Sequence, residues 1–224
     1  MEPTTQPAVR RLAIFDLDGT LTRHDTFFPF VVGLLLRHPA RWPRVALLLV
    51  PALGYLLRRL DRGGLKGAIL HCLFNDMRRE TVTAFARQYA EKVVPGRMFA
   101  EAVATFRTHL AGGDHVVVLS ASPDLYVPEI ARLLQAHEVI CSEIRWSGDR
   151  LDGRLAGPNR RDHEKARVLE GLRVRMPELP VIAYGNSTAD LAHMHRCEQG
   201  VYVNASPALA ARLEQGGLRC VQWR

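Results

Sequence analysis

The chain has 224 residues, of which 47% are hydrophobic, so length and composition argue against intrinsic disorder and predict one well-buried core with a modest insertion beside it. Its formal net charge of +7 favours anionic partners, although a generally basic solvated surface explains the charge as well. Four cysteines lie far apart without a CxxC pair, which argues against a zinc knuckle or a disulfide framework and favours a reducing cytoplasm.

The first predicted elements are a strand and a helical insertion. Residues 11–16 form a short buried strand, because four consecutive apolar residues precede an aspartate and a glycine follows. The segment before it has no apolar run, so we expect no cleaved signal peptide. From about residue 22 to residue 94 the pattern becomes helical, with apolar blocks at 27–36 and 45–57 that arginines and prolines separate. This segment is interpreted as an inserted helical subdomain.

Beyond Pro95 and Gly96, apolar residues recur at three- and four-residue intervals from 98 to 110, which predicts a helix that ends at Gly112 and Gly113. Strands at 115–119, 139–141 and 181–184 then alternate with helices after Pro123 and near 164–172, and further short elements follow at 200–203 and 207–213. Residues 146–155 are typical of a small hairpin. The alternation predicts an α/β fold with a parallel sheet, helices on both faces and a ligand site at the carboxyl ends of the strands.

Two acids follow the first strand in the segment FDLDGT. Asp16 and Asp18 leave the strand on the same side, because side chains alternate across a strand. One carboxylate can attack phosphorus while its neighbour moves protons. Gly19 lets the backbone approach an anion. Taken alone, the pair favours an aspartate-rich surface turn over a catalytic pair.

Further candidates lie where the sheet predicts a site. Ser120 follows a predicted strand and can bond a phosphate oxygen, and Lys165 near a helix start can neutralise a phosphoryl group. Asn186 and Asp190 follow another strand and can serve a cation. Singly, each is explained as a helix cap, a turn residue or a solvated charge. Their common order at strand ends favours one shared site.

Four segments together resemble the ordered motifs of the haloacid-dehalogenase-like hydrolases: DLDGT at 16–20, LSAS at 119–122, Lys165 in NRRDHEK, and GNSTAD at 185–190. More narrowly they resemble the phosphoserine-phosphatase-like branch (subfamily IB), whose cap is a helical insertion after the first motif. The resemblance covers the chain from Arg11 to about Leu213. It implies a three-layer Rossmann-like core of residues 1–21 and 95–224, with a helical cap at 22–94.

The resemblance also implies a role for each matching residue. Asp16 would be the nucleophile, Asp18 the acid and base, Ser120 the holder of the phosphoryl group and Lys165 its counter-charge. The implied cofactor is Mg²⁺, which prefers hard oxygen ligands. Its expected ligands are Asp16, Asp18, Asn186 and Asp190, and the expected substrate-binding residues are Gly19, Thr20, Asp25, Ala121 and Ser187.

Three positions refine the expectation. Dehalogenating relatives lack the second acid and related ion pumps carry Thr there, so Asp18 favours a phosphatase. Asn186 stands where the family usually has a metal-binding Asp, which predicts a raised magnesium requirement. In the third motif, where related sequences often have NCxGxEK, this chain has Arg160 and Asp162.

The implied activity is a magnesium-dependent phosphomonoesterase that forms a phospho-aspartate on a small phosphorylated metabolite, phosphoserine-like or histidinol-phosphate-like. Phosphoserine phosphatases carry a Glu seven residues after the second Asp, and this chain has the shorter Asp25 there. Asp25 is equally suited to cap the helix that begins near Phe27.

Two other functions remain open. The long apolar cap resembles that of the phosphatidylglycerophosphatase of some bacteria, which suggests a lipid phosphatase at an anionic membrane surface. Its apolar blocks are shorter than the roughly 20 residues of a spanning helix, so it would lie in the interface. The arginines near the headgroups would be Arg37, Arg41, Arg44, Arg58 and Arg59. The alternative packing is a helical hairpin folded on itself and on the core.

A non-catalytic module that binds a phosphorylated ligand is the other function, and Asn186 is its main support. We expect no nucleic acid partner and a cytoplasmic location, with the option of membrane association.

Overall fold

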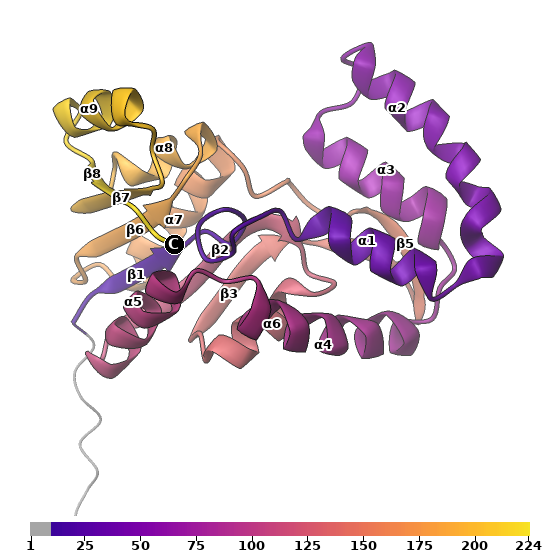
Figure 1. Ribbon diagram of the computed structural model, residues 1–224, viewed down its shortest axis with the longest axis horizontal. Helices are drawn as coiled ribbons and strands as arrows, with labels where there is room; N and C mark the ends of the chain where they lie inside the picture. Colours follow the sequence, from indigo (N-terminus) through magenta and orange to yellow (C-terminus); the bar gives the residue numbers. More distant parts are fainter. Residues whose placement is uncertain (1–9) are drawn as a thin grey trace, which may run out of the picture.

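The computed structural model describes residues 10–224. Two expectations concern residues 1–9, namely the absence of a signal peptide and the start of the core, and both lie outside the described residues. Its main sheet has six parallel strands in the order β3-β2-β1-β6-β7-β8 (Figure 1). The strands are β1 (Leu12–Phe15), β2 (His115–Pro123), β3 (Glu138–Ser142), β6 (Val181–Gly185), β7 (Gln199–Val203) and β8 (Arg219–Val221). The predicted α/β fold with a parallel sheet is confirmed.

Helices cover both faces of this sheet. They are α5 (Ala100–Ala111), α6 (Val127–Leu134), α7 (His163–Arg175), α8 (Thr188–Met194) and α9 (Pro207–Gln215). Leu12 and Ile14 of β1 face the cluster that contains α7, α8 and α9 residues. Ala13 and Phe15 face the opposite cluster, with α5 and α6. All four are fully buried, because a central parallel strand has helices over both of its faces.

A helical insertion lies between β1 and α5. It contains α1 (Phe27–Leu36), the 3₁₀ helix η1 (Pro39–Leu48), α2 (Leu49–Leu56), α3 (Arg62–Phe74) and α4 (Arg79–Gly96). The apolar block predicted at 27–36 is α1, whereas the block at 45–57 is divided between η1 and α2. Asp61 caps α3 by accepting a hydrogen bond from the Gly64 amide at 2.6 Å.

The two ends of the insertion pair with each other. Thr22 and Met98 form an antiparallel bridge, the Arg23 amide donates to the Arg97 carbonyl at 2.8 Å, and the Phe99 amide donates to the Leu21 carbonyl at 3.1 Å. Two helices of the insertion contact the rest of the chain: α3 packs on the hairpin of β4 (Ile144–Ser147) and β5 (Arg150–Leu155), and α4 packs on α6. The hairpin predicted at 146–155 is confirmed. The division at residues 22 and 94 stays a prediction, which the pairing of the two ends supports.

An aromatic cluster joins the insertion to the core. The rings of Phe30 in α1 and Tyr126 before α6 have centroids 4.6 Å apart. The Tyr126 hydroxyl lies 2.9 Å from Thr26 Oγ1, and the Tyr89 hydroxyl of α4 donates to the Thr26 carbonyl at 2.7 Å. Because Thr26 also contacts Asp18, this cluster places the start of α1 against the predicted site.

Candidate active site

The predicted site residues meet at the carboxyl ends of three neighbouring strands. Asp16 follows β1, Ser120 lies in β2, and Asn186 follows β6. β1 lies between β2 and β6, where the strand order changes direction, and such a switch point leaves a crevice for ligands. The register between β2 and β3 shifts between Leu119 and Pro123, so the chain is irregular at Ser120.

Lys165, in the first turn of α7, joins two of the predicted acids. Its Nζ donates to Asp16 Oδ1 and to Asp190 Oδ1, each at 2.6 Å. The Lys165 side chain is 3% exposed. A buried ammonium group is stable only when opposite charges surround it, and here two carboxylates do so.

Burial and charge act differently on these three groups. Burial raises the pKa of Asp16 to about 7, although the Lys165 ammonium opposes the shift, and the charges of Asp190 and Asp18 add to it. Burial also acts to raise the pKa of Asp190, but Lys165 and the Ser187 hydroxyl lower it below its usual value. For Lys165, burial acts to lower the pKa, and the two carboxylates outweigh it and raise the pKa.

Asp190 has partners for both of its carboxylate oxygens. While Oδ1 accepts from Lys165, Oδ2 accepts from the Ser187 amide at 3.0 Å, the Ser187 hydroxyl at 2.7 Å and the Asn186 amide at 3.3 Å. Ser187 and Asp190 thereby form a capping box at the start of α8. The Ser187 hydroxyl, expected at the substrate, points to Asp190 instead, and its substrate role stays a prediction.

Asp18 belongs to a separate set of hydrogen bonds. Its Oδ1 accepts from the Thr26 amide at 2.7 Å and from the Thr26 hydroxyl at 2.6 Å, and its Oδ2 accepts from the Ser122 hydroxyl at 2.5 Å. These donors come from the insertion and from β2. They fix the carboxylate beside Asp16 without engaging Lys165, which suits a group that exchanges protons.

Gly19, Thr20 and Asn186 pack closely around Asp16. Gly19 has φ +82°, and a Cβ atom there would lie 2.0 Å from Asn186 Nδ2, so this position needs glycine. The Thr20 hydroxyl lies 3.2 Å from Asp16 Oδ2 and 3.3 Å from Asn186 Oδ1. A carboxylate oxygen and an amide oxygen therefore converge on one hydroxyl.

Ser120 is buried beside Ser122. Its Oγ accepts a hydrogen bond from the Ser122 amide at 3.0 Å, and no acceptor within residues 10–224 takes the hydroxyl proton, so the hydroxyl can still act as a donor. The neighbouring Ala121 carbonyl accepts from Lys66 Nζ at 3.1 Å and from the Ser142 hydroxyl at 3.2 Å. The main chain at Ala121 is thus fixed from both sides.

Lys66 reaches the site from α3, and no sequence motif predicts it. Its Nζ lies 5.4 Å from the centroid of the Phe27 ring. Burial lowers the pKa of Lys66, and the carboxylates of Asp18 and Asp25 oppose that shift. One compositional signal marks it: the chain contains three lysines among its 30 basic residues, and two of the three, Lys66 and Lys165, are at this site.

Asp25, expected at the substrate, has a capping bond. Its Oδ2 accepts from the Phe28 amide at 2.9 Å at the start of α1. Burial raises the pKa of Asp25, and the Asp18 charge adds to that shift while Lys66 opposes it. The helix-cap interpretation thus has a hydrogen bond in its favour, and the proximity to Asp18 and Lys66 keeps the substrate-binding prediction open.

The residues around Asp16 fit a magnesium ion by their chemistry. Among residues 10–224 no group of three or more His, Cys, Asp and Glu side chains has the arrangement of a metal site. The ligands expected here include the amide of Asn186, which is not one of those four residue types. Asp16 and Asn186 offer hard oxygens, and Mg²⁺ needs few protein ligands because it keeps several waters. Charge also favours a cation, because Lys165 pairs with Asp16 and Asp190 while the Asp18 carboxylate acts on Lys66, which sets three carboxylates against two ammonium groups. A phosphate would add more negative charge.

Comparison with known proteins agrees with this arrangement. The sequence profile of the haloacid dehalogenase-like hydrolases matches residues 13–195. Protein CicA of Caulobacter vibrioides is 38% identical over 184 residues, which cover 80% of this chain and 79% of that protein.

Solved structures share the fold. A Bordetella pertussis Tohama I protein of unknown function superposes with a TM-score of 0.79 at 22% identity, covering 96% of this chain and 99% of that one. A phospho-aspartyl intermediate analogue of phosphoserine phosphatase superposes with a TM-score of 0.63 at 17% identity, covering 95% of this chain and 93% of that one. At these identities the likeness concerns the fold alone.

Proposed function

The chain belongs to the haloacid dehalogenase-like hydrolases, and on that premise we propose that it hydrolyses phosphate monoesters of small metabolites through a phospho-aspartate on Asp16. The observation that carries the proposal is the division of labour between two acids. Asp16 is held by Lys165, whereas Asp18 is held by Thr26 and Ser122. Two neighbouring carboxylates in different environments suit two different roles.

In the first step, an Asp16 oxygen attacks phosphorus and the bond from phosphorus to the ester oxygen breaks. Protonated Asp18 gives its proton to the leaving oxygen. In the second step, water attacks the phospho-aspartate while Asp18 takes a proton from that water. The bond between Asp16 and phosphorus breaks, and inorganic phosphate leaves with Asp16 regenerated.

Other groups hold the phosphoryl oxygens and balance their charge. Ser120 has a hydroxyl proton to donate, and Lys165 is fixed beside the attacking oxygen at 2.6 Å. Asp16, the Asp18 carbonyl and Asn186 are the proposed magnesium ligands, with Asp190 acting on them through its bond to the Asn186 amide. When bound, Mg²⁺ would supply positive charge to the phosphoryl group. Phosphoryl transfer chiefly needs such positioning and neutralisation.

Two charged residues of the insertion suggest the kind of substrate. The charges of Asp18, Asp25 and Lys66 influence one another, so Lys66 and Asp25 both lie near the proposed acid. From there Lys66 can bind an anionic group next to the ester, and Asp25 can bind a cationic group. A phosphorylated compound with both groups, such as phosphoserine, is therefore the first substrate to test. Histidinol phosphate has the cationic group alone.

A phosphatase screen decides among the candidate functions. Para-nitrophenyl phosphate with Mg²⁺ tests for turnover, and Asp16→Asn is the blank. The panel should contain phosphoserine, histidinol phosphate, sugar phosphates, nucleotides and phosphatidylglycerophosphate. Preference for the last compound would favour the lipid phosphatase, for which the exposed apolar helix α2 is the specific observation. A wild type without activity under varied metals would favour the non-catalytic binding module instead.

A further inference from the structure

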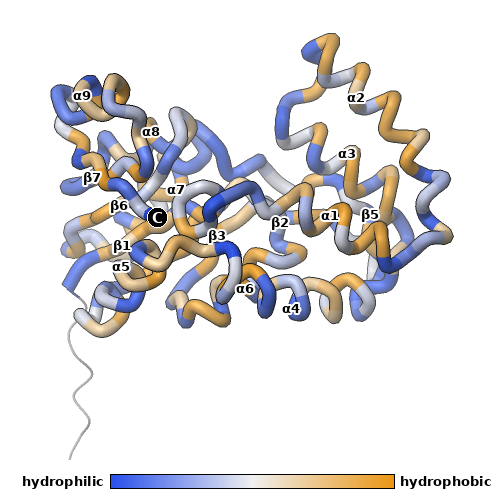
Figure 2. The backbone as a smooth tube through the Cα atoms, in the orientation of Figure 1, coloured by the Kyte–Doolittle hydropathy of each residue, from blue (hydrophilic) through white to orange (hydrophobic). Residues whose placement is uncertain are grey.

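Helix α2 leaves most of its apolar side chains uncovered. We call the set Leu49, Val50, Leu53, Leu56 and Leu57 the α2 face, and their exposed fractions are 75%, 76%, 55%, 79% and 54%. Figure 2 shows this segment as mainly hydrophobic and at the far end of the molecule from α9. Neighbouring η1 adds the exposed Trp42, Val45 and Leu47. Contiguous apolar surface of this kind marks an interaction site.

The packing of α2 explains why it needs cover. The helix packs against η1 and α3, and Pro51 is its buried residue. Its other sides are apolar as well, since residues 49–57 contain no charged side chain. A helix that is hydrophobic all round is normally buried in a protein or in lipid.

The charge around the α2 face has one sign. Residues 26–60 contain no Asp or Glu, and they carry the five arginines Arg37, Arg41, Arg44, Arg58 and Arg59. None of these five forms a salt bridge within residues 10–224. Arg41 and Arg44 donate instead to the Asn75 carbonyl, at 3.0 and 3.1 Å. Apolar surface and unbalanced positive charge therefore occur on the same segment.

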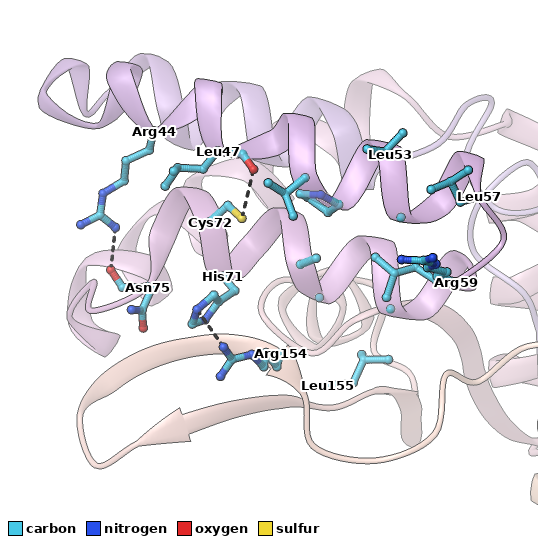
Figure 3. Close-up of a pocket in the computed structure, with 17 residues that line it drawn as sticks. Arg44, Leu47, Leu53, Leu57, Arg59, His71, Cys72, Asn75, Arg154 and Leu155 are labelled. Carbon is cyan, nitrogen blue, oxygen red and sulfur yellow. Dashed lines mark hydrogen bonds between the residues drawn. The ribbon is translucent and has the colours of Figure 1, made fainter.

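A groove runs beside the α2 face. It has a volume of about 1090 Å³ and lies between α2 and α3, with the end of β5 below it (Figure 3). Leu53 and Leu57 line it, and Arg44, Arg59 and Arg154 are at its border. Hydrocarbon in the groove and an anionic group at the border would satisfy both kinds of surface.

We infer that the α2 face binds the surface of an anionic phospholipid bilayer, with its leucines among the acyl chains and its arginines at the headgroups. A second copy of the chain is a poor occupant, because five arginines that form no salt bridge within residues 10–224 would face five more across the interface. Anionic lipid supplies both the hydrocarbon and the negative charge. None of the helices within residues 10–224 is both long and apolar enough to cross a membrane, so the contact is with the surface.

The catalytic residues take no part in this contact. In α3, His71 and Cys72 line the groove, while Lys66 reaches the active site at Ala121. Lipid binding can thus be measured without a substrate, and its failure is separate from a failure of the proposed phosphatase activity.

Flotation with vesicles tests the inference. Wild-type protein should float with phosphatidylcholine vesicles that contain phosphatidylglycerol, and far less with phosphatidylcholine alone. Val50→Glu should reduce the floated fraction by more than about tenfold, because it places a charge where the valine side chain would enter the acyl region of the bilayer. Val174→Glu is the matched control, since Val174 is the same residue type, 82% exposed, on helix α7 of the core. Thermal unfolding checks that both variants fold.

The electrostatic part has its own variant. The double substitution Arg58→Gln with Arg59→Gln should weaken binding by about fivefold per arginine, and added salt should weaken the wild type similarly. Absence of flotation at low salt would overturn the inference, as would Val50→Glu floating as well as Val174→Glu. So would a stable dimer or a protein complex that covers the α2 face in the absence of any vesicle binding.

Discussion

Lys66 donates a hydrogen bond across 3.1 Å to the main-chain carbonyl of Ala121, the residue next to Ser120 in β2. The contact joins α3 of the helical insertion to the strand that is proposed to hold the phosphoryl group. A charged group that reaches this place from the insertion is well situated to distinguish substrates, because it lies beside the proposed phosphoryl-binding residue and is not one of the acids proposed for the chemistry.

Replacing this lysine should alter substrate preference. Lys66→Gln is expected to lower kcat/KM for a substrate with a second anionic group. The corresponding rise in activation free energy should be about 1.5–3 kcal/mol, the strength of a charged hydrogen bond. Para-nitrophenyl phosphate, which lacks such a group, should be affected less. Lys92→Gln, at an exposed lysine of α4, is the control. Equal losses on both substrates would argue that Lys66 only supports the structure.

The two acids should respond differently to substitution. Asp16→Asn should release no phosphate, because the amide cannot form the covalent intermediate. Asp18→Asn should retain activity reduced by about 10²–10⁴-fold, the usual contribution of a general acid and base. Phosphate release in a colorimetric assay measures both. Asp149→Asn, whose side chain is 75% exposed, should behave as wild type. An Asp16→Asn variant with unchanged turnover would refute the nucleophile assignment.

Asn186→Asp should lower the magnesium concentration needed for half-maximal activity, because a carboxylate binds Mg²⁺ more strongly than an amide oxygen. In EDTA the same variant should unfold at a lower temperature, since the new charge lies next to Asp16. Thr20 bridges these two side chains at 3.2 and 3.3 Å. Titrating Mg²⁺ in a phosphatase assay and in a thermal shift assay checks both effects. An unchanged magnesium dependence would show that Asn186 is not a ligand.

The metal-free protein should lose stability as pH rises. Burial raises the pKa of Asp16 from 3.8 to about 7, so the folded state binds this proton more tightly than the unfolded chain. The stabilising contribution is complete below about pH 4 and is lost as pH rises through about 7. Urea unfolding in EDTA across this range should show the decline in wild type and a flatter profile in Asp16→Asn. Parallel profiles for the two proteins would contradict the raised pKa.

Lys165→Met should destabilise the protein by about 3–5 kcal/mol, because it leaves two buried carboxylates without their counter-charge. Its Nζ lies 2.6 Å from an oxygen of Asp16 and of Asp190. Urea unfolding at neutral pH measures the loss. Arg167→Met, on the same helix but 74% exposed, should change stability little. Phosphatase activity should fall in Lys165→Met but not in Arg167→Met.

The sheet and the meeting of Asp16 with Asn186 could be predicted because the strands are continuous apolar runs whose carboxyl ends share one edge. Local pattern did not reveal Lys66, since its place depends on how α3 packs over the site. It also did not divide the apolar block at 45–57 into η1 and α2. Strand β8, three residues long at Arg219–Val221, went unpredicted because so short a segment has no periodicity.

Hydrogen bonds of Ser187 show a second limit. The motif predicts a group for the substrate, which stays a prediction, and the structure adds a capping box in which the Ser187 hydroxyl donates to Asp190. A hydroxyl can serve either purpose, and the choice depends on the distance to a carboxylate three residues away.

The paired backbone at Thr22 and Met98 has an evolutionary consequence. Two chain positions that are distant in the sequence are adjacent here in space, so the insertion can be exchanged without severing a strand of the sheet. Chimaeras that join this core to the insertion of a relative should therefore fold when the donor's helices match the β4–β5 hairpin and helix α6, on which α3 and α4 pack.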